Sequence, residues 1–111
     1  MKPYFSNHFK QQVKRLLKKF PHLKENLLKD LRKLDSNNEI HIGHSIYKVR
    51  IKSSDLKKGK SGGFRSYILV LKTKSLIIPL CIYAKNEKET LTESELKYHV
   101  DKTNEDLKKL P

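Results

Sequence analysis

The segment Lys57–Tyr67 reads Lys-Lys-Gly-Lys-Ser-Gly-Gly-Phe-Arg-Ser-Tyr and is the most informative part of the chain. Its first half mixes lysines with glycines, which make poor core material because glycine loses much backbone entropy on folding and lysine resists burial. Its second half begins a β-prone run, Phe64–Leu71. We therefore predict a basic loop that leads into a buried strand, and we expect an anionic partner to meet this loop.

Two apolar runs follow the loop. Phe64–Leu71 and Leu76–Tyr83 are typical of central strands that are covered on both faces, with a turn at residues 72–75. Pro79 cannot donate a hydrogen bond to a neighbouring strand, so we expect a local irregularity there. Cys81, the only cysteine, lies in the same run and is predicted to be a buried, inert thiol.

Upstream of the loop, Ser45–Ser53 alternates apolar and basic residues, which predicts a half-buried strand. Glu39–Ile42 is a shorter strand candidate, joined to it by a turn at Gly43 and His44. The alternation places three cations on one face, roughly 7 Å apart along the strand, although a solvated face explains the pattern equally well. These cations are Lys48, Arg50 and Lys52.

Helices flank the strands. Asn7–Lys19 carries apolar side chains at spacings of three and four, and a second helix with a leucine stripe is predicted to begin at Pro21. The two should form a hairpin, whose exposed lysines are more simply explained as a solvated face than as an RNA contact. Thr92–Glu95 has the capping-box pattern that opens a final helix. The sequence thus predicts an α+β fold of two helices, four strands and a third helix, in a single domain over residues 1–111.

Composition limits the partners and the compartment. The 111 residues carry a formal charge of +13, with a pI of about 9.9, which indicates a polyanionic partner, RNA or DNA before an anionic membrane. One cysteine allows no intrachain disulfide, and no apolar stretch matches a signal peptide or a membrane span. We therefore predict a cytoplasmic protein with no membrane partner.

Several enzyme classes lack their markers. The histidines are scattered, so neither a metal nor a cofactor is expected, and there is no Gly-x-Ser-x-Gly elbow or complete Walker loop. What remains is a set of cations with one tyrosine, which could hold RNA and stabilise the charge that develops when its 2′-hydroxyl attacks the adjacent phosphorus. The members are Lys48, Arg50, Lys52, Lys57, Lys58, Lys60, Arg65, Lys85 and Tyr83.

The chain resembles the RelE/ParE toxin superfamily, and in particular its HigB-type members, in three pieces: Tyr47–Lys52, Lys58–Arg65 and Ile82–Glu87, the last followed by Leu91. The resemblance covers about residues 46–96, and the helical N-terminal third matches only in pattern. It implies a helical hairpin packed on a twisted antiparallel sheet of about four strands, plus a C-terminal helix. It also implies an endoribonuclease that cuts mRNA in the ribosomal A site, and a cognate antitoxin protein as partner.

The resemblance further implies individual roles. Lys48 and Arg50 occupy the positions of strand residues that contact or deprotonate the substrate. Arg65 matches the arginine that stabilises the scissile phosphate. Lys85 matches a cation that the C-terminal strand contributes. Where the family's best-studied enzyme has a C-terminal tyrosine, this chain has Thr92, so other residues must supply the proton chemistry. The candidates are Tyr83, Lys57, Lys58 and Lys60.

Arg65 is accordingly predicted to be a fixed catalytic cation, and Tyr67 to share its face of the strand. Four lysines are predicted to bind RNA: Lys52, Lys57, Lys58 and Lys60. Two other functions stay open at this point. One is a ParE-like toxin that inhibits DNA gyrase without nuclease activity, and the other is a non-catalytic RNA-binding module.

Overall fold

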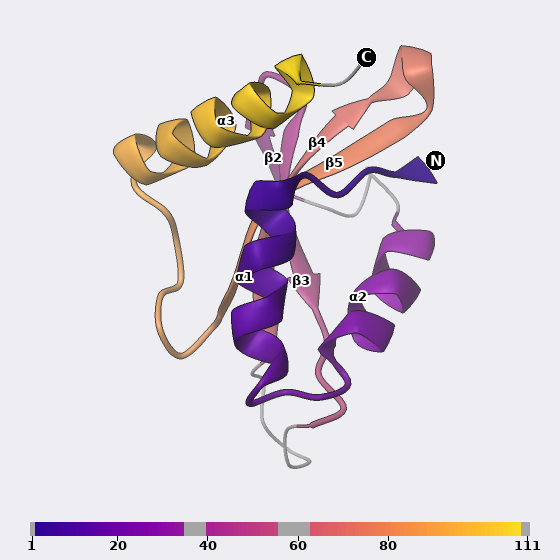
Figure 1. Cartoon of the computed structure of the whole chain (residues 1–111), viewed down its shortest axis with the longest axis vertical. Helices are drawn as coiled ribbons and strands as arrows, with labels where there is room; N and C mark the ends of the chain where they lie inside the picture. The colour runs from indigo at the N-terminus through magenta and orange to yellow at the C-terminus, as the bar shows by residue number, and fades with distance from the viewer. Residues whose placement is uncertain (1, 35–39, 56–62, 110–111) are drawn as a thin grey trace.

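The described residues of the computed structural model, 2–34, 40–55 and 63–109, form one sheet with helices on both faces (Figure 1). The strand order is β1-β5-β4-β3-β2, and β2 to β5 are antiparallel neighbours, as predicted. The bounds are Ile40–Gly43 for β2, Ile46–Ile51 for β3, Phe64–Leu71 for β4 and Leu76–Ala84 for β5. The strand predicted over residues 45–53 is therefore shorter than expected, and Lys52 lies beyond its end.

The edge strand β1 (Lys2–Pro3) corrects the predicted sheet, which becomes five-stranded and mixed. It pairs in parallel with β5, and the backbone N–H groups of Lys2 and Tyr4 donate to the carbonyls of Ser75 and Ile77 at 2.9 and 2.8 Å. Two residues are too few to show a period-two pattern, so no sequence signal marks this strand.

Helices α1 (Asn7–Leu17) and α2 (Leu23–Arg32) form the predicted hairpin and cover one face of the sheet (Figure 1). Helix α1 ends slightly earlier than predicted, and α2 begins after Pro21 rather than at it. The reason is Phe20, whose buried ring packs edge-on against Phe64 with centroids 4.9 Å apart. The turn needed to bury this ring leaves Pro21 exposed outside the helix.

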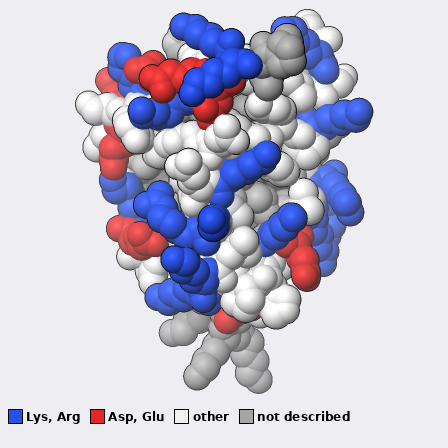
Figure 2. Space-filling model, viewed as in Figure 1, with Lys and Arg blue, Asp and Glu red and all other residues white. Residues whose placement is uncertain are grey.

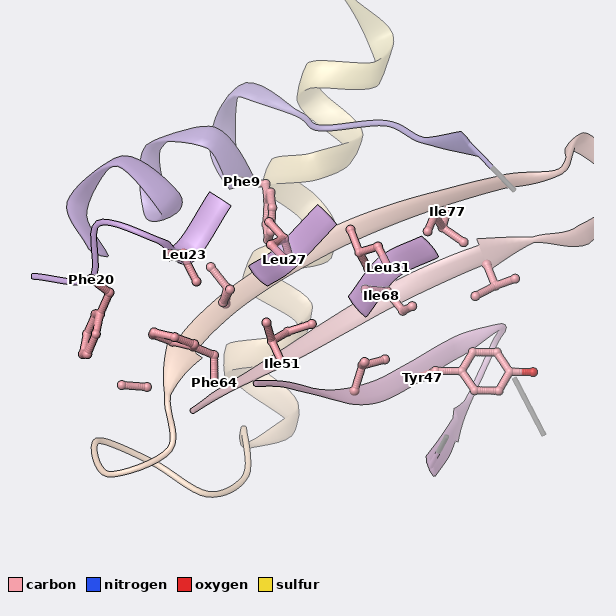
Figure 3. Close-up of a cluster of buried hydrophobic side chains, with 14 residues drawn as sticks. Phe9, Phe20, Leu23, Leu27, Leu31, Tyr47, Ile51, Phe64, Ile68 and Ile77 are labelled. Carbon is pink, nitrogen blue, oxygen red and sulfur yellow. The ribbon is translucent and has the colours of Figure 1, made fainter. Parts of the chain in front are cut away.

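The main core lies between this hairpin and the sheet (Figure 3). Phe9 of α1 and Leu23 and Leu27 of α2 are almost fully buried in one cluster with Phe64 and Ile68 of β4. Burying each large apolar side chain contributes about 1.5–3 kcal/mol to stability. The cluster therefore fixes β4 in the middle of the sheet, as its apolar run predicted. It also fixes the position of Arg65, which follows Phe64.

Gln12 of α1 forms hydrogen bonds with the backbone of β5 beyond the point where β1 ends. Its side-chain amide accepts a hydrogen bond from the N–H of Ile82 at 3.0 Å and donates one to the carbonyl of Leu80 at 3.4 Å, as a neighbouring strand would. A lone glutamine in an amphipathic helix carries no sequence signal for such a role, because glutamine is mostly exposed.

The irregularity predicted at Pro79 is confirmed as a bulge in β5. Tyr67 lies opposite Cys81 and the next residue, Ile68, lies opposite Pro79, so Leu80 is the extra residue. Leu80 and Cys81 consequently both belong to a smaller core on the second face of the sheet. Cys81 is buried, as predicted, and this burial raises the pKa of its thiol to about 12, which leaves very little reactive thiolate at neutral pH.

Helix α3 (Glu93–Lys108) covers this second face with Leu96 and Val100. It opens with the predicted capping box, in which the Thr92 hydroxyl accepts from the N–H of Glu95 at 3.1 Å and the Glu95 carboxylate accepts from the N–H of Thr92 at 2.9 Å. Within the described ranges, none of the helices combines the length and the apolar character that crossing a lipid bilayer would require.

A pair of histidines joins α3 to the N-terminal end of α1. His8 Nε2 and His99 Nδ1 are 2.7 Å apart, and the Asp106 carboxylate accepts a hydrogen bond from the backbone N–H of His8 at 2.8 Å. Burial, followed by the neighbouring His8, lowers the pKa of His99 to about 4, and burial also lowers the pKa of His8. Both rings are therefore neutral at pH 7.

Acidification is expected to weaken this link. The pKa of His99 is lower in the folded state, so the unfolded chain binds the proton more tightly and acid favours unfolding. The contribution of His99 to the free energy of unfolding is therefore complete above pH 6.5 and is lost as the pH falls toward about 4. Urea unfolding at neutral pH and at about pH 5 should show the loss in the wild type and a smaller one in His99→Gln. An equal loss in both proteins would assign the effect to other groups.

Candidate active site

Three neighbouring strands bring the main predicted site residues to the sheet face that α1 and α2 leave uncovered. Arg50 of β3 lies directly opposite Arg65 of β4, which in turn lies opposite Tyr83 of β5. Lys48 lies two residues before Arg50 and directly opposite Tyr67. Because directly opposed residues point to the same side of a sheet, Lys48 and Tyr67 share this face with Arg50 and Arg65. The prediction that Tyr67 shares the face of Arg65 is confirmed.

Arg65 is buried to a degree that is rare for an arginine. It is 2% exposed, its Nη1 donates to the Phe64 carbonyl at 3.4 Å, and its Nε lies 3.6 Å from a carboxylate oxygen of Glu89. Arg50 places a second positive charge directly across the strand pair, and like charges at opposed positions destabilise a sheet. Such a local conflict is expected at a functional site, and a bound anion would relieve it.

Lys48 converges on the same point as Arg65. Its side chain is 13% exposed, and its ammonium donates to Thr90 Oγ1 at 3.1 Å and lies 3.9 Å from the Glu89 oxygen that faces Arg65. Two cations that share one anionic oxygen are arranged as a binding site for a phosphate would be. Glu89 and Thr90 were not predicted as site residues, because they lie between β5 and α3 in a segment without periodicity.

Two tyrosines border this pair of cations. The rings of Tyr67 and Tyr83 are stacked with centroids 6.4 Å apart, and the Tyr83 hydroxyl donates to the backbone carbonyl of Glu89 at 3.3 Å. The Tyr67 hydroxyl accepts from the N–H of Leu91 at 3.2 Å. Burial, and then the neighbouring Tyr67, raises the pKa of Tyr83 above its usual value. Tyr83 therefore stays protonated at neutral pH and can donate a proton.

The other predicted site residues lie around the pair formed by Lys48 and Arg65 or outside the described residues. Arg50 is exposed, and Lys52 is exposed beyond the end of β3, where its backbone N–H donates to the Asp30 carboxylate of α2 at 2.7 Å. The half-buried Lys85 follows β5, and its backbone N–H donates to the carbonyl of Gly63 at 3.0 Å. The remaining three, Lys57, Lys58 and Lys60, lie outside the described residues.

Gly63 sits immediately before β4 and controls how the chain enters it. Its φ is +104°, and a Cβ at this position would lie 2.5 Å from the backbone carbonyl oxygen of Ile51. That contact cannot be relieved by rotating a side chain, so only glycine fits. The path of the backbone into β4 therefore depends on Gly63, and so does the position of Arg65.

Gly63→Ala is expected to lower the free energy of unfolding by about 2 kcal/mol or more, since both the backbone strain and the clash oppose it. Gly43→Ala is the matched control: its φ is +120°, but no atom lies within 4 Å of the added Cβ. The control should cost only the strain, about 1 kcal/mol. Denaturant unfolding of both proteins measures the difference, and equal losses would show that the close approach to Ile51 is unimportant.

A cleft of about 430 Å³ adjoins the site where α1, β5 and α3 meet. Its lining includes Tyr83 and Leu91 as well as the cations Arg15 and Lys88. Positive charge is not confined to this region: Figure 2 shows lysines and arginines spread over the face formed by α1 and α2. The candidate site is therefore distinguished by the burial and convergence of its cations, and not by charge alone.

The chain is similar to known proteins in its sequence family and in its fold. The family described as "RelE toxin of RelE / RelB toxin-antitoxin system" matches residues 6–110. A solved structure of an Escherichia coli toxin RelE mutant in the free state aligns with a TM-score of 0.56 over 88% of this chain and 95% of that one, at 18% sequence identity. No curated protein sequence matches the chain.

Within the described residues, no three histidine, cysteine or acidic side chains meet where they could hold a metal ion.

Proposed function

The chain belongs to the RelE toxin family, and on that basis we propose that it is a ribosome-dependent endoribonuclease, which cuts mRNA in the A site and so stops translation. The observation that carries this proposal is the convergence of Lys48 Nζ and Arg65 Nε on one carboxylate oxygen, 3.9 and 3.6 Å away. The Tyr83 hydroxyl lies beside them, bonded to the backbone of the same acidic residue. These groups suit a single phosphate flanked by a proton donor.

The proposed reaction is attack by the 2′-hydroxyl of RNA on the adjacent phosphorus. The 2′-oxygen passes its proton to solvent water as the new O–P bond forms, and the 5′-oxygen gains a proton as its bond to phosphorus breaks. Arg65 and Lys48 stabilise the extra negative charge of the phosphorane, and the Tyr83 hydroxyl, which lies beside them, donates to the leaving oxygen. No step requires a metal ion.

RNA binding is assigned to the cations around this centre. Arg50 lies exposed on the same face, and Lys52 and Lys85 lie at the ends of β3 and β5. Lys57, Lys58 and Lys60, which lie outside the described residues, complete the proposed contact with mRNA and ribosomal RNA. The same basic surface is the proposed target of a cognate antitoxin, and the protein is proposed to act in the cytoplasm, as a HigB-type member of its family.

The test is brief expression of the chain in bacteria, followed by primer extension on abundant transcripts. New 5′ ends inside translated regions are expected, and purified gyrase should supercoil DNA normally in the presence of the protein. Intact transcripts together with inhibited gyrase would favour a ParE-like toxin. Salt-sensitive RNA binding without cleavage on ribosomes would leave only a non-catalytic RNA-binding module.

A further inference from the structure

The carboxylate of Glu89 occupies the point at which the two proposed catalytic cations meet. One of its oxygens lies 3.6 Å from Arg65 Nε and 3.9 Å from Lys48 Nζ. Within the described parts of the chain, it is the only acidic side chain that pairs with either of them. A carboxylate at this position presents the same charge and the same oxygen acceptors as a phosphate would.

The backbone around Glu89 is fixed by hydrogen bonds, whereas its side chain is held, among the described residues, by the two cations alone and is partly exposed to solvent. The Glu89 carbonyl accepts from Tyr83, and the adjoining residues are bonded to the site: Thr90 accepts from Lys48 at 3.1 Å, and the N–H of Leu91 donates to Tyr67 at 3.2 Å. The Glu89 side chain is nevertheless 57% exposed, whereas that of Arg65 is 3% exposed. Rotation of this one side chain into solvent would therefore open the site without moving the segment.

We propose that Glu89 stands in the place of the scissile phosphate and competes with it, so that it sets how tightly an RNA must be held before it is cut. This inference rests on the proposed function of the site. A carboxylate and a phosphate cannot both contact Arg65 and Lys48 without strong repulsion, so RNA binds only to molecules in which Glu89 has turned away. The apparent affinity for RNA is reduced by the fraction of such molecules.

This competition favours RNA that is held by additional contacts. Free RNA relies mainly on the site itself and on nearby cations, and it must displace Glu89 with that binding energy alone. An mRNA presented by a ribosome gains further contacts between the protein and the ribosome, so it can displace the carboxylate and still saturate the site. Glu89 thus acts as a repulsive element that discriminates against free RNA.

The test compares Glu89→Gln with Glu93→Gln, an exposed residue of the first turn of α3 that undergoes the same change of charge. The probe is a fluorescent RNA oligonucleotide with 2′-O-methyl groups, which binds but cannot be cut. Glu89→Gln is expected to bind it roughly tenfold more tightly than the wild type, and Glu93→Gln less than about twofold more tightly. On ribosomes, Glu89→Gln should lower the KM and leave kcat unchanged.

Equal tightening by both variants would overturn the proposal in favour of a general charge effect. So would a loss of kcat in Glu89→Gln at unchanged affinity, because that result assigns Glu89 to proton transfer. Glu89→Ala should behave like Glu89→Gln, and Lys48→Met should shrink the gain from Glu89→Gln, since the competition depends on the shared cation. Tighter binding by Glu89→Gln without cleavage by any form would refute the nuclease function and uphold the competition.

Discussion

Replacing Arg65 with alanine is expected to slow the cleavage of ribosome-bound mRNA by about a hundredfold or more. Arg65 is held by burial and by its place in β4, so it can stabilise the developing charge without reorganising. Removal of one such preorganised donor at a charged transition state has an effect of about this size. Single-turnover rates on purified ribosomes measure it directly, because they separate the chemical step from product release.

Two variants are matched to this change. Arg65→Lys keeps the charge but loses the planar fork of donors, so its rate should fall between those of the wild type and Arg65→Ala. Lys58→Ala removes one cation of the basic segment that the sequence predicts to bind RNA, and it should mainly weaken binding. Thermal unfolding of all three checks that the buried position is still folded. Equal losses of rate from Arg65→Ala and Lys58→Ala would contradict the division between a fixed catalytic cation and a binding loop.

Replacing Tyr83 with phenylalanine is expected to slow cleavage by about a hundredfold, with little change in RNA affinity. The substitution keeps the ring that stacks on Tyr67 and removes only the hydroxyl. Proton transfer by a positioned side chain contributes about a hundredfold or more to enzymatic rates. The rate at saturating ribosome concentration is the quantity to measure.

Tyr98→Phe is the control for this change, because Tyr98 is 53% exposed on α3. It should leave the rate unaltered. The Tyr83 hydroxyl also donates to the Glu89 carbonyl, so a purely structural role would lower stability or affinity instead of the rate. A Tyr83→Phe protein that cleaves at the rate of the wild type would remove this residue from the proton chemistry.

Local periodicity predicted much of the fold and part of the site. The alternation in β3 correctly placed Lys48 and Arg50 on one face, and the apolar runs correctly marked β4 and β5 as central strands. The capping pattern correctly located the start of α3. These features depend on neighbouring residues alone, so they can be read before the chain is folded.

The features that were missed depend on contacts between distant parts of the chain. Strand β1 and the Gln12 contact with β5 have no periodic pattern, because each is defined by the edge of a strand far away in sequence. Glu89 enters the site because its segment folds back across β4 and β5. The bulge at Leu80 also shifts the alternation in β5, so a simple count along the strand would have placed its first half on the wrong face.

The most direct measurement is the cleavage of a defined mRNA on purified ribosomes by the wild-type protein. Once the cut has been mapped, the same mRNA is prepared with a single 2′-deoxynucleotide on the 5′ side of the scissile phosphate. The expected result is rapid cleavage of the all-RNA substrate, leaving a 2′,3′-cyclic phosphate, and no cleavage of the substituted one. Equal cleavage of both substrates, or cleavage of neither, would contradict an endoribonuclease that uses the 2′-hydroxyl at Arg65 and Lys48.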